Sequence, residues 1–186
     1  MDTANIRKLT PYQDINSILV DWTEKAKKIL GENVVGLYLS GSLSYGDFVP
    51  ERSDIDLQAV VRPPLNQSEL NSIEQLHRGL DEQYPAWKGR LECSYVPIEL
   101  MQEVLPPKIS RPWWGFDTLY SEADAGNEWI INHYFLSKQG ERSHQSKTGG
   151  APGRICASTW SAILQSRSMF HECRFVLLKP APCRTP

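Results

Sequence analysis

The chain has no apolar run that approaches the ~18 residues needed for a membrane-spanning helix. Its first eight residues, Met-Asp-Thr-Ala-Asn-Ile-Arg-Lys, lack the apolar segment of a secretory signal. From these two absences we expect a cytoplasmic protein with no membrane partner.

Cysteine is scarce, and its four positions form no recognisable framework. Cys93, Cys156, Cys173 and Cys183 include no Cys-x-x-Cys pair, and their spacing fits neither a zinc ribbon nor a zinc finger. We therefore expect no disulfide framework, no structural zinc site and no catalytic Cys–His pair.

The chain also lacks a basic excess, since its formal net charge is −2. A general nucleic-acid-binding surface is typically basic, so we expect no DNA partner. The 186 residues are 40% hydrophobic and 23% charged, which is typical of a soluble globular protein of one domain, with room for an appendage.

Hydrophobic periodicity predicts alternating helices and strands up to about residue 140. Helices are predicted over residues 11–30, from a cap at Ser68 to about residue 84, and over residues 127–139. Strands are predicted over residues 34–39, 54–61 and 91–96. This order favours an α/β or α+β domain with a small mixed sheet flanked by helices.

The composition changes after Gly140. Residues 1–140 hold 13 basic and 20 acidic residues, whereas residues 141–186 hold 7 basic and 2 acidic ones. We interpret residues 1–140 as the folded domain and residues 141–186 as an irregular tail. With ordinary codons chosen for residues 141–152, a reading frame shifted by one base can encode Leu-Ile-Ser-Pro-Lys-Pro-Glu-Glu-Leu. We therefore hypothesise a frame-shifted tail, which the DNA sequence of the gene would test.

The most informative stretch couples a small-residue turn to two nearby carboxylates. Gly41-Ser42 follows an apolar run, and Asp54 and Asp56 flank Ile55 at the start of the next predicted strand. Residues i and i+2 of a strand share a face, so the two carboxylates are expected side by side. A divalent cation such as Mg²⁺ would relieve their repulsion, and backbone N–H groups of the turn would hold phosphates.

A third carboxylate and a pair of tryptophans complete the candidate residues. Glu92 lies on the polar side of an alternating strand, between the apolar Leu91 and Cys93. Trp113 and Trp114 fit two interpretations, stacking on a sugar or base and packing in the core.

This arrangement resembles the nucleotidyltransferase superfamily related to DNA polymerase beta. The closer resemblance, over roughly residues 12–140, is to the aminoglycoside adenylyltransferases that act on streptomycin and spectinomycin. The matching positions are Gly41, Ser42, Gly46, Pro50, Ser53, Asp54, Ile55, Asp56, Leu57, Leu91 and Glu92.

The resemblance implies a nucleotidyltransferase fold that transfers AMP from ATP to a hydroxyl of an aminoglycoside, releasing pyrophosphate. Asp54, Asp56 and Glu92 would bind Mg²⁺, and Glu92 would also act as general base. Gly41 and Ser42 would hold the triphosphate. Members of the family carry a helical C-terminal domain that helps bind the acceptor, and the tail replaces it here.

Two alternatives stay open from the sequence. One is a nucleotidyltransferase of the toxin–antitoxin type that modifies protein or tRNA. The other is a truncated nucleotide-binding domain without turnover. The oligomeric state is open as well.

Overall fold

The computed structural model describes residues 9–62, 64–103 and 105–132. Its helices are α2 (Gln13–Leu30), α3 (Gly41–Tyr45) and α4 (Gln67–Gln83), with the 3-10 helices η1 (Gly31–Asn33), η2 (Pro85–Trp87) and η3 (Ile98–Gln102). Its strands are β1 (Val34–Leu39), β2 (Ile55–Val61), β3 (Leu91–Pro97), β4 (Arg111–Gly115) and β5 (Thr118–Ala123).

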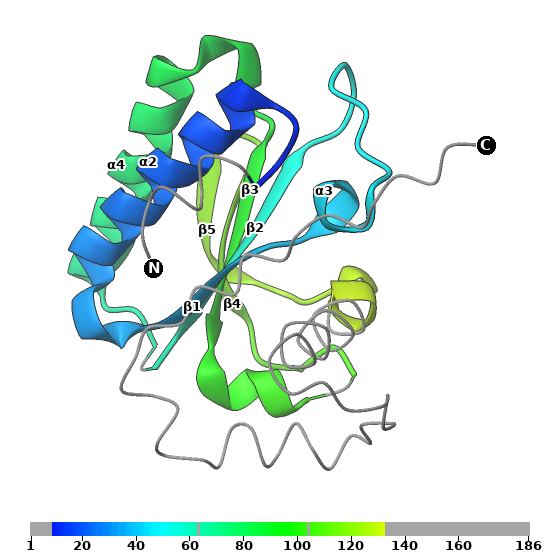
Figure 1. Cartoon of the computed structure of the whole chain (residues 1–186). Helices are drawn as coiled ribbons and strands as arrows, with labels where there is room; N and C mark the ends of the chain where they lie inside the picture. The colour runs from blue at the N-terminus through cyan, green and yellow to red at the C-terminus, as the bar shows by residue number, and fades with distance from the viewer. Residues whose placement is uncertain (1–8, 63, 104, 133–186) are drawn as a thin grey trace, which may run out of the picture.

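The five strands form one mixed sheet in the order β1-β2-β3-β4-β5 (Figure 1). Strands β2 and β3 are parallel and are joined through α4, whereas the other neighbouring pairs are antiparallel. The predicted mixed sheet flanked by helices is thus confirmed.

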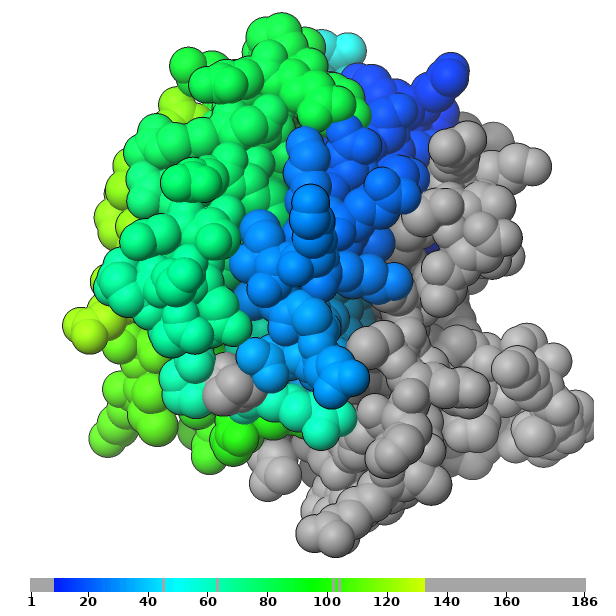
Figure 2. Space-filling model, turned by 90° about the vertical axis from the view of Figure 1, so that its left-hand side faces the viewer, coloured from blue at the N-terminus to red at the C-terminus, as the bar shows by residue number. Residues whose placement is uncertain are grey.

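Helices α2 and α4 cover one face of the sheet side by side (Figures 1 and 2). Their apolar residues recur at helical spacing, and they bury a continuous core against alternate residues of the strands. Fully or nearly fully buried members include Ile15, Ile18, Leu19, Trp22, Ile73, Leu80, Ile55, Leu57, Leu91, Cys93 and Tyr95.

A buried histidine links α4 to the sheet. His77 Nε2 lies 2.8 Å from the Tyr95 hydroxyl on β3, and its ring stacks on Trp114 of β4 at a centroid distance of 4.9 Å. All three side chains are almost completely buried. Burial lowers the pKa of His77 to about 3, so the ring is neutral in the folded protein.

The opposite face of the sheet is apolar at one end only. There, Val60 and Val96 pack with Leu100, Met101 and Trp129 in a second, smaller core. Because the strands are parallel, the other end of the same face carries the early residues of β2 and β3. That end holds the polar side chains of the candidate site.

The structure corrects several predicted boundaries. Helix α2 begins at Gln13 rather than at residue 11, and α4 begins at Gln67. Its cap is Asn66 instead of Ser68, because Asn66 and Glu69 bond reciprocally in a capping box. Strand β2 begins at Ile55, so Asp54 directly precedes the strand that was predicted to contain it.

Other differences concern elements that the periodicity did not reveal. The predicted Gly-Ser turn is the first part of the short helix α3, and strands β4 and β5 were not predicted. Residues 128–132 are helical, as predicted from residue 127. The rest of that helix and the tail of residues 141–186 lie outside the described residues. Within the described ranges, no helix combines the length and apolarity needed to cross a bilayer.

Candidate active site

Two carboxylates predicted to share a site are direct neighbours across the parallel strands β2 and β3. Asp56 on β2 pairs in register with Glu92 on β3. Both side chains are half-buried, and the residues that flank them, Ile55, Leu57, Leu91 and Cys93, point into the core on the helical side. The alternation of each strand therefore places Asp56 and Glu92 together on the face without helices α2 and α4.

The third carboxylate, Asp54, lies two residues before Asp56. Asp54 immediately precedes β2, and its side chain is 47% exposed. Its Oδ1 lies 3.9 Å from Nε of Arg90, the residue that immediately precedes β3. The structure thus brings Asp54, Asp56 and Glu92 to the same end of the sheet.

Gly41 lies directly against the Asp56 side chain. Its φ is +60°, and a Cβ at this position would overlap the Asp56 carboxylate. The preceding residue secures the contact, because Ser40 N donates to the Asp56 carbonyl oxygen at 2.9 Å and Ser40 Oγ to the same oxygen at 3.3 Å. Only glycine combines this backbone conformation with this close approach.

Ser42 is the next residue of the same turn and is partly buried. Its carbonyl oxygen accepts hydrogen bonds from Gly46 N at 3.0 Å and Asp47 N at 3.1 Å, which close the short helix α3. Gly46 adopts a left-handed conformation and ends this helix. The role of Ser42 in holding phosphate stays a prediction.

The carboxylates stand in an environment that disfavours negative charge. Burial, and next the charge of Asp54, raise the pKa of Asp56 to about 6. Burial, and then the charges of Asp56, Asp54 and Glu128, raise the pKa of Glu92 to about 7. Carboxyl groups with a pKa near neutrality are suited to proton transfer at physiological pH, and they cluster at functional sites.

The donor chemistry of this group fits a hard divalent cation such as Mg²⁺, because every donor is a carboxylate oxygen. The side-chain positions fit less well. Within the described part of the chain, no three His, Cys, Asp or Glu side chains lie close enough together to hold a metal ion. Binding of a cation by all three carboxylates would therefore require at least one of them to rotate.

Charged residues that the sequence analysis did not select also reach this face. Arg111 on β4 is 5% exposed, and its Nη2 donates to Ser94 Oγ at 3.3 Å and lies 3.5 Å from Glu128 Oε1. Glu128 in turn raises the pKa of Glu92. No local sequence signal marks this network, because its members come from three separate segments.

The two adjacent tryptophans have different environments, which the sequence left open. Trp114 is 1% exposed and belongs to the core. Trp113 pairs with Ser94, two residues from Glu92, and its indole lies over Gly115 and stacks on Tyr120 at 5.5 Å. Trp113 is therefore a surface aromatic on the same face as the carboxylates.

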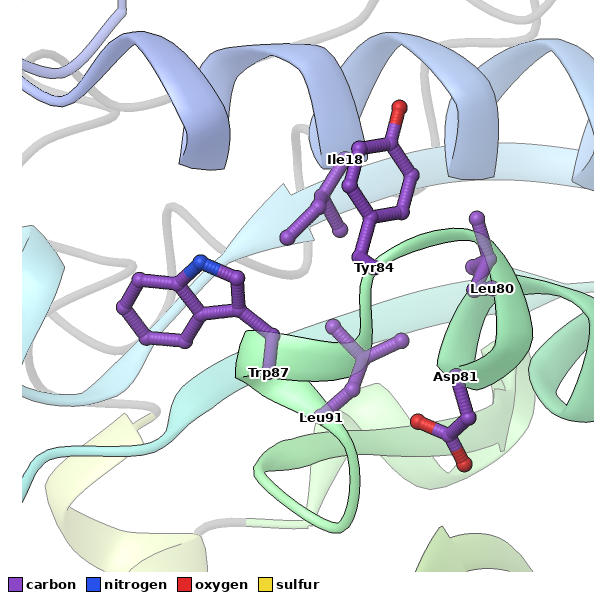
Figure 3. Close-up of a pocket in the computed structure, with 6 residues that line it drawn as sticks. All are labelled: Ile18, Leu80, Asp81, Tyr84, Trp87 and Leu91. Atoms are coloured by element: carbon purple, nitrogen blue, oxygen red, sulfur yellow. The ribbon is translucent and has the colours of Figure 1, made fainter.

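A small pocket of the domain lies away from this site, beneath the helices. It measures about 10 Å³, enough for about one water molecule, and is lined by Ile18, Leu80, Asp81, Tyr84, Trp87 and Leu91 (Figure 3). A wider groove between the start of α2 and the end of α4 also lies on the helical side. Neither of these two spaces is lined by the three carboxylates, which lie on the opposite face of the sheet.

A family model matches one segment of the chain. Residues 23–109 match the family model described as nucleotidyltransferase domain. The matched segment contains Gly41, Ser42, Asp54, Asp56 and Glu92, and it ends before β4. No curated protein matches the chain. The match supports nucleotidyl transfer as the general activity of this domain.

Proposed function

We propose that this chain, whose residues 23–109 carry the nucleotidyltransferase domain, transfers AMP from ATP to a hydroxyl of an aminoglycoside-type antibiotic in a Mg²⁺-dependent reaction. The observation that carries the proposal is the pairing of Asp56 with Glu92, next to a glycine turn that lies directly against the Asp56 carboxylate. The sequence resemblance around Asp54 and Asp56 supplies the choice of acceptor.

In the proposed reaction, an acceptor hydroxyl oxygen attacks the α-phosphorus of ATP, and the bond from that phosphorus to the pyrophosphate oxygen breaks. The hydroxyl proton passes to Glu92, whose pKa of about 7 makes it an effective base at neutral pH. Positioning of the two reactants in line supplies much of the rate enhancement.

Asp54, Asp56 and Glu92 would hold Mg²⁺, which when bound neutralises the phosphate oxygens that acquire charge during transfer. Gly41 and Ser42 would approach the triphosphate through their backbone N–H groups, since Gly41 has no side chain to keep a phosphate away. Burial, and next the charge of Asp54, raise the pKa of Asp56, and a bound cation would favour its ionised form.

The acceptor would lie beside Glu92, on the side of β4. Trp113 and Tyr120 form an aromatic surface there, and Phe116, 71% exposed, meets the Trp113 ring edge-on at 5.6 Å. Aromatic faces of this kind suit the apolar face of a sugar ring. This feature supports an acceptor that contains rings bearing hydroxyl groups.

The test is an incubation of the full chain with ATP labelled in the α-phosphate, Mg²⁺ and a panel of acceptors. The panel comprises streptomycin, spectinomycin, bulk protein and tRNA, and released pyrophosphate is measured in parallel. Label on an aminoglycoside, absent with the Asp54→Asn/Asp56→Asn variant, supports the proposal. Label on protein or tRNA, or ATP binding without release of pyrophosphate, contradicts it.

A further inference from the structure

The Arg90 side chain makes three contacts with the segment that carries Asp54. Its Nη2 donates to the carbonyl oxygen of Pro50 at 2.6 Å and to that of Ser53, and its Nε lies 3.9 Å from Asp54 Oδ1. Arg90 is only partly exposed, with a side-chain exposure of 25%. Its guanidinium therefore contacts the loop at more than one point rather than extending into solvent.

The backbone of Arg90 binds the same segment from the other side of Asp54. The carbonyl oxygen of Arg90 accepts a hydrogen bond from Ile55 N at 2.8 Å. Asp54 is thus enclosed between two peptide groups that both bond to Arg90, the Ser53 carbonyl before it and the Ile55 amide after it. A single residue fixes the backbone of this carboxylate on both sides.

A set of aromatic side chains keeps Arg90 in place. Its guanidinium lies 4.5 Å from the ring centroid of Trp87, a cation–π contact. Trp87 Nε1 donates to Asp14 Oδ2 of α2 at 2.7 Å, and Figure 3 shows the indole at the side of the pocket beneath α2. Phe48 stacks on Trp87 at 6.1 Å and so attaches the loop before Asp54 to the same indole.

The loop itself is a compact turn that contacts the rest of the domain through Phe48 as well as through Arg90. Ser53 N donates to the Val49 carbonyl oxygen at 2.8 Å, Arg52 N donates to it at 3.0 Å, and Ser53 Oγ accepts from Val49 N at 3.0 Å. These bonds close the turn internally. Arg90 connects the closed turn to the start of β3, the strand that carries Glu92.

We propose that Arg90 is a positioning residue of the transfer site: it fixes Asp54 relative to Asp56 and Glu92 by holding the loop of residues 46–54 to the start of β3. This inference rests on the proposed function and adds to it a residue outside the carboxylate group. The planar guanidinium is required, because its Nη2 bonds the carbonyl oxygens of Pro50 and Ser53 while its face lies over the indole of Trp87.

The alternative role for an arginine here is direct binding of a nucleotide phosphate. The two roles separate in kinetics. A phosphate ligand makes its contact in the substrate complex, so its loss raises the KM for ATP, whereas a misplaced carboxylate lowers kcat. Displacement of a reacting group by about 1 Å can cost about 100-fold in rate.

The experiment compares Arg90→Gln and Arg90→Lys with a matched control, Arg78→Gln. Arg78 is an exposed residue of α4 that pairs with Glu74 at 2.7 Å. We expect Arg90→Gln to lower kcat about 100-fold with the KM for ATP changed less than about threefold. Arg90→Lys should stay about tenfold below wild type, because an ammonium has no planar face that can lie over Trp87 while it bonds the two carbonyl groups. The control should keep wild-type kinetics.

A second readout is independent of activity. Arg52 is exposed in the loop, so trypsin can cleave after it once the loop opens. We expect cleavage after Arg52 to accelerate at least about tenfold in Arg90→Gln and to stay unchanged in Arg78→Gln, since the rate follows local opening. Circular dichroism confirms that each variant is folded, and Arg90→Lys serves if Arg90→Gln does not fold.

The outcomes separate this inference from the proposed function. An unchanged kcat, a rise in KM alone, or unchanged cleavage after Arg52 overturns the positioning role. A wild-type protein that transfers no label to any acceptor overturns the proposed function instead. In that case the trypsin comparison still decides whether Arg90 holds the loop.

Discussion

Gly41 and Asp56 are in such close contact that the carboxylate of Asp56 occupies the space where a Cβ of residue 41 would stand. Gly41 also has a φ of +60°, which other residues rarely adopt. The turn and the strand are therefore fitted to each other at the position of a candidate catalytic carboxylate. The contact has a direct experimental consequence.

Gly41→Ala is expected to lower both activity and stability. The new methyl group must displace the Asp56 side chain, and the backbone is strained, so we expect a loss of at least about 1 kcal/mol in the free energy of unfolding and a large fall in kcat. Gly79→Ala is the matched control, because Gly79 lies within α4 with nothing near its Cβ position. It should gain about 0.5–1 kcal/mol. The free energies of unfolding are measured with urea. Equal changes in the two variants would contradict the close contact between Gly41 and Asp56.

Glu92→Gln tests the general base. The variant cannot accept a proton, so we expect kcat to fall about 10²–10⁴-fold with little change in the KM for ATP. In the wild type, kcat should fall about tenfold per pH unit below the pKa of Glu92, which is about 7 in the metal-free protein and is lowered by bound Mg²⁺, and this limb should be absent in the variant. Glu99→Gln, at an exposed position just after β3, is the control. If the kcat of Glu92→Gln still falls at low pH as in the wild type, the general base is another group.

Asp56→Asn should inactivate the protein yet stabilise its fold in the absence of Mg²⁺. The pKa of Asp56 is raised to about 6, so the folded state binds this proton more tightly than the unfolded state does. The resulting stability is fully present below about pH 4 and is lost as the pH rises through 6. Asparagine has no such loss, so the variant should exceed wild type by about 1–2 kcal/mol at pH 7.5 and match it at pH 4.

The measurement for Asp56→Asn is urea unfolding in chelator-treated buffer across this pH range, with Asp47→Asn as an exposed control. Added Mg²⁺ should stabilise the wild type more than the variant, because binding to the folded state raises its stability. A variant that is less stable than wild type at pH 7.5 would show that the carboxylate is favourably paired.

His77 should make the protein sensitive to acid. Its pKa is lowered to about 3 by burial, so below about pH 6.5 the unfolded chain binds a proton that the folded protein does not. Stability is therefore present above pH 6.5 and falls by up to about 1.4 kcal/mol per pH unit towards pH 3. His77→Gln removes this dependence, and comparison of its urea unfolding with that of wild type from pH 4 to 7.5 is the test. Parallel pH profiles for the two proteins would refute it.

The sequence predicted the elements whose hydrophobic pattern is regular. The helical spacing of α2 and α4 and the apolar runs of β1, β2 and β3 were sufficient for this purpose. The hairpin of β4 and β5 was missed, because Pro112 interrupts the strand pattern at a bulge between Arg111 and Trp113. Its turn residues, Phe116 and Asp117, both have positive φ but lack the usual Asn-Gly signal.

The sequence indicated the candidate site residues one by one, whereas it did not indicate how they are arranged in space. Spacing along a strand indicated that Asp54 and Asp56 lie close together, and alternation placed Glu92 on a polar face. The pairing of Asp56 with Glu92 depends on the register of two parallel strands, which is set by how α4 packs on the sheet. The role of Arg90 was not predicted, because an arginine before a strand is commonly solvated. Its hydrogen-bond partners also lie about 40 residues earlier in the chain.

The parallel pairing of β2 with β3 also bears on how the protein folds. Asp56 and Glu92 become neighbours only after the chain has completed the crossover through α4, so no local segment contains the pair. Non-local pairings of this kind form slowly, since the intervening chain must be ordered first. Recovery of catalysis during refolding would then follow the closure of this crossover, and helix formation in α2 and α4 would precede it.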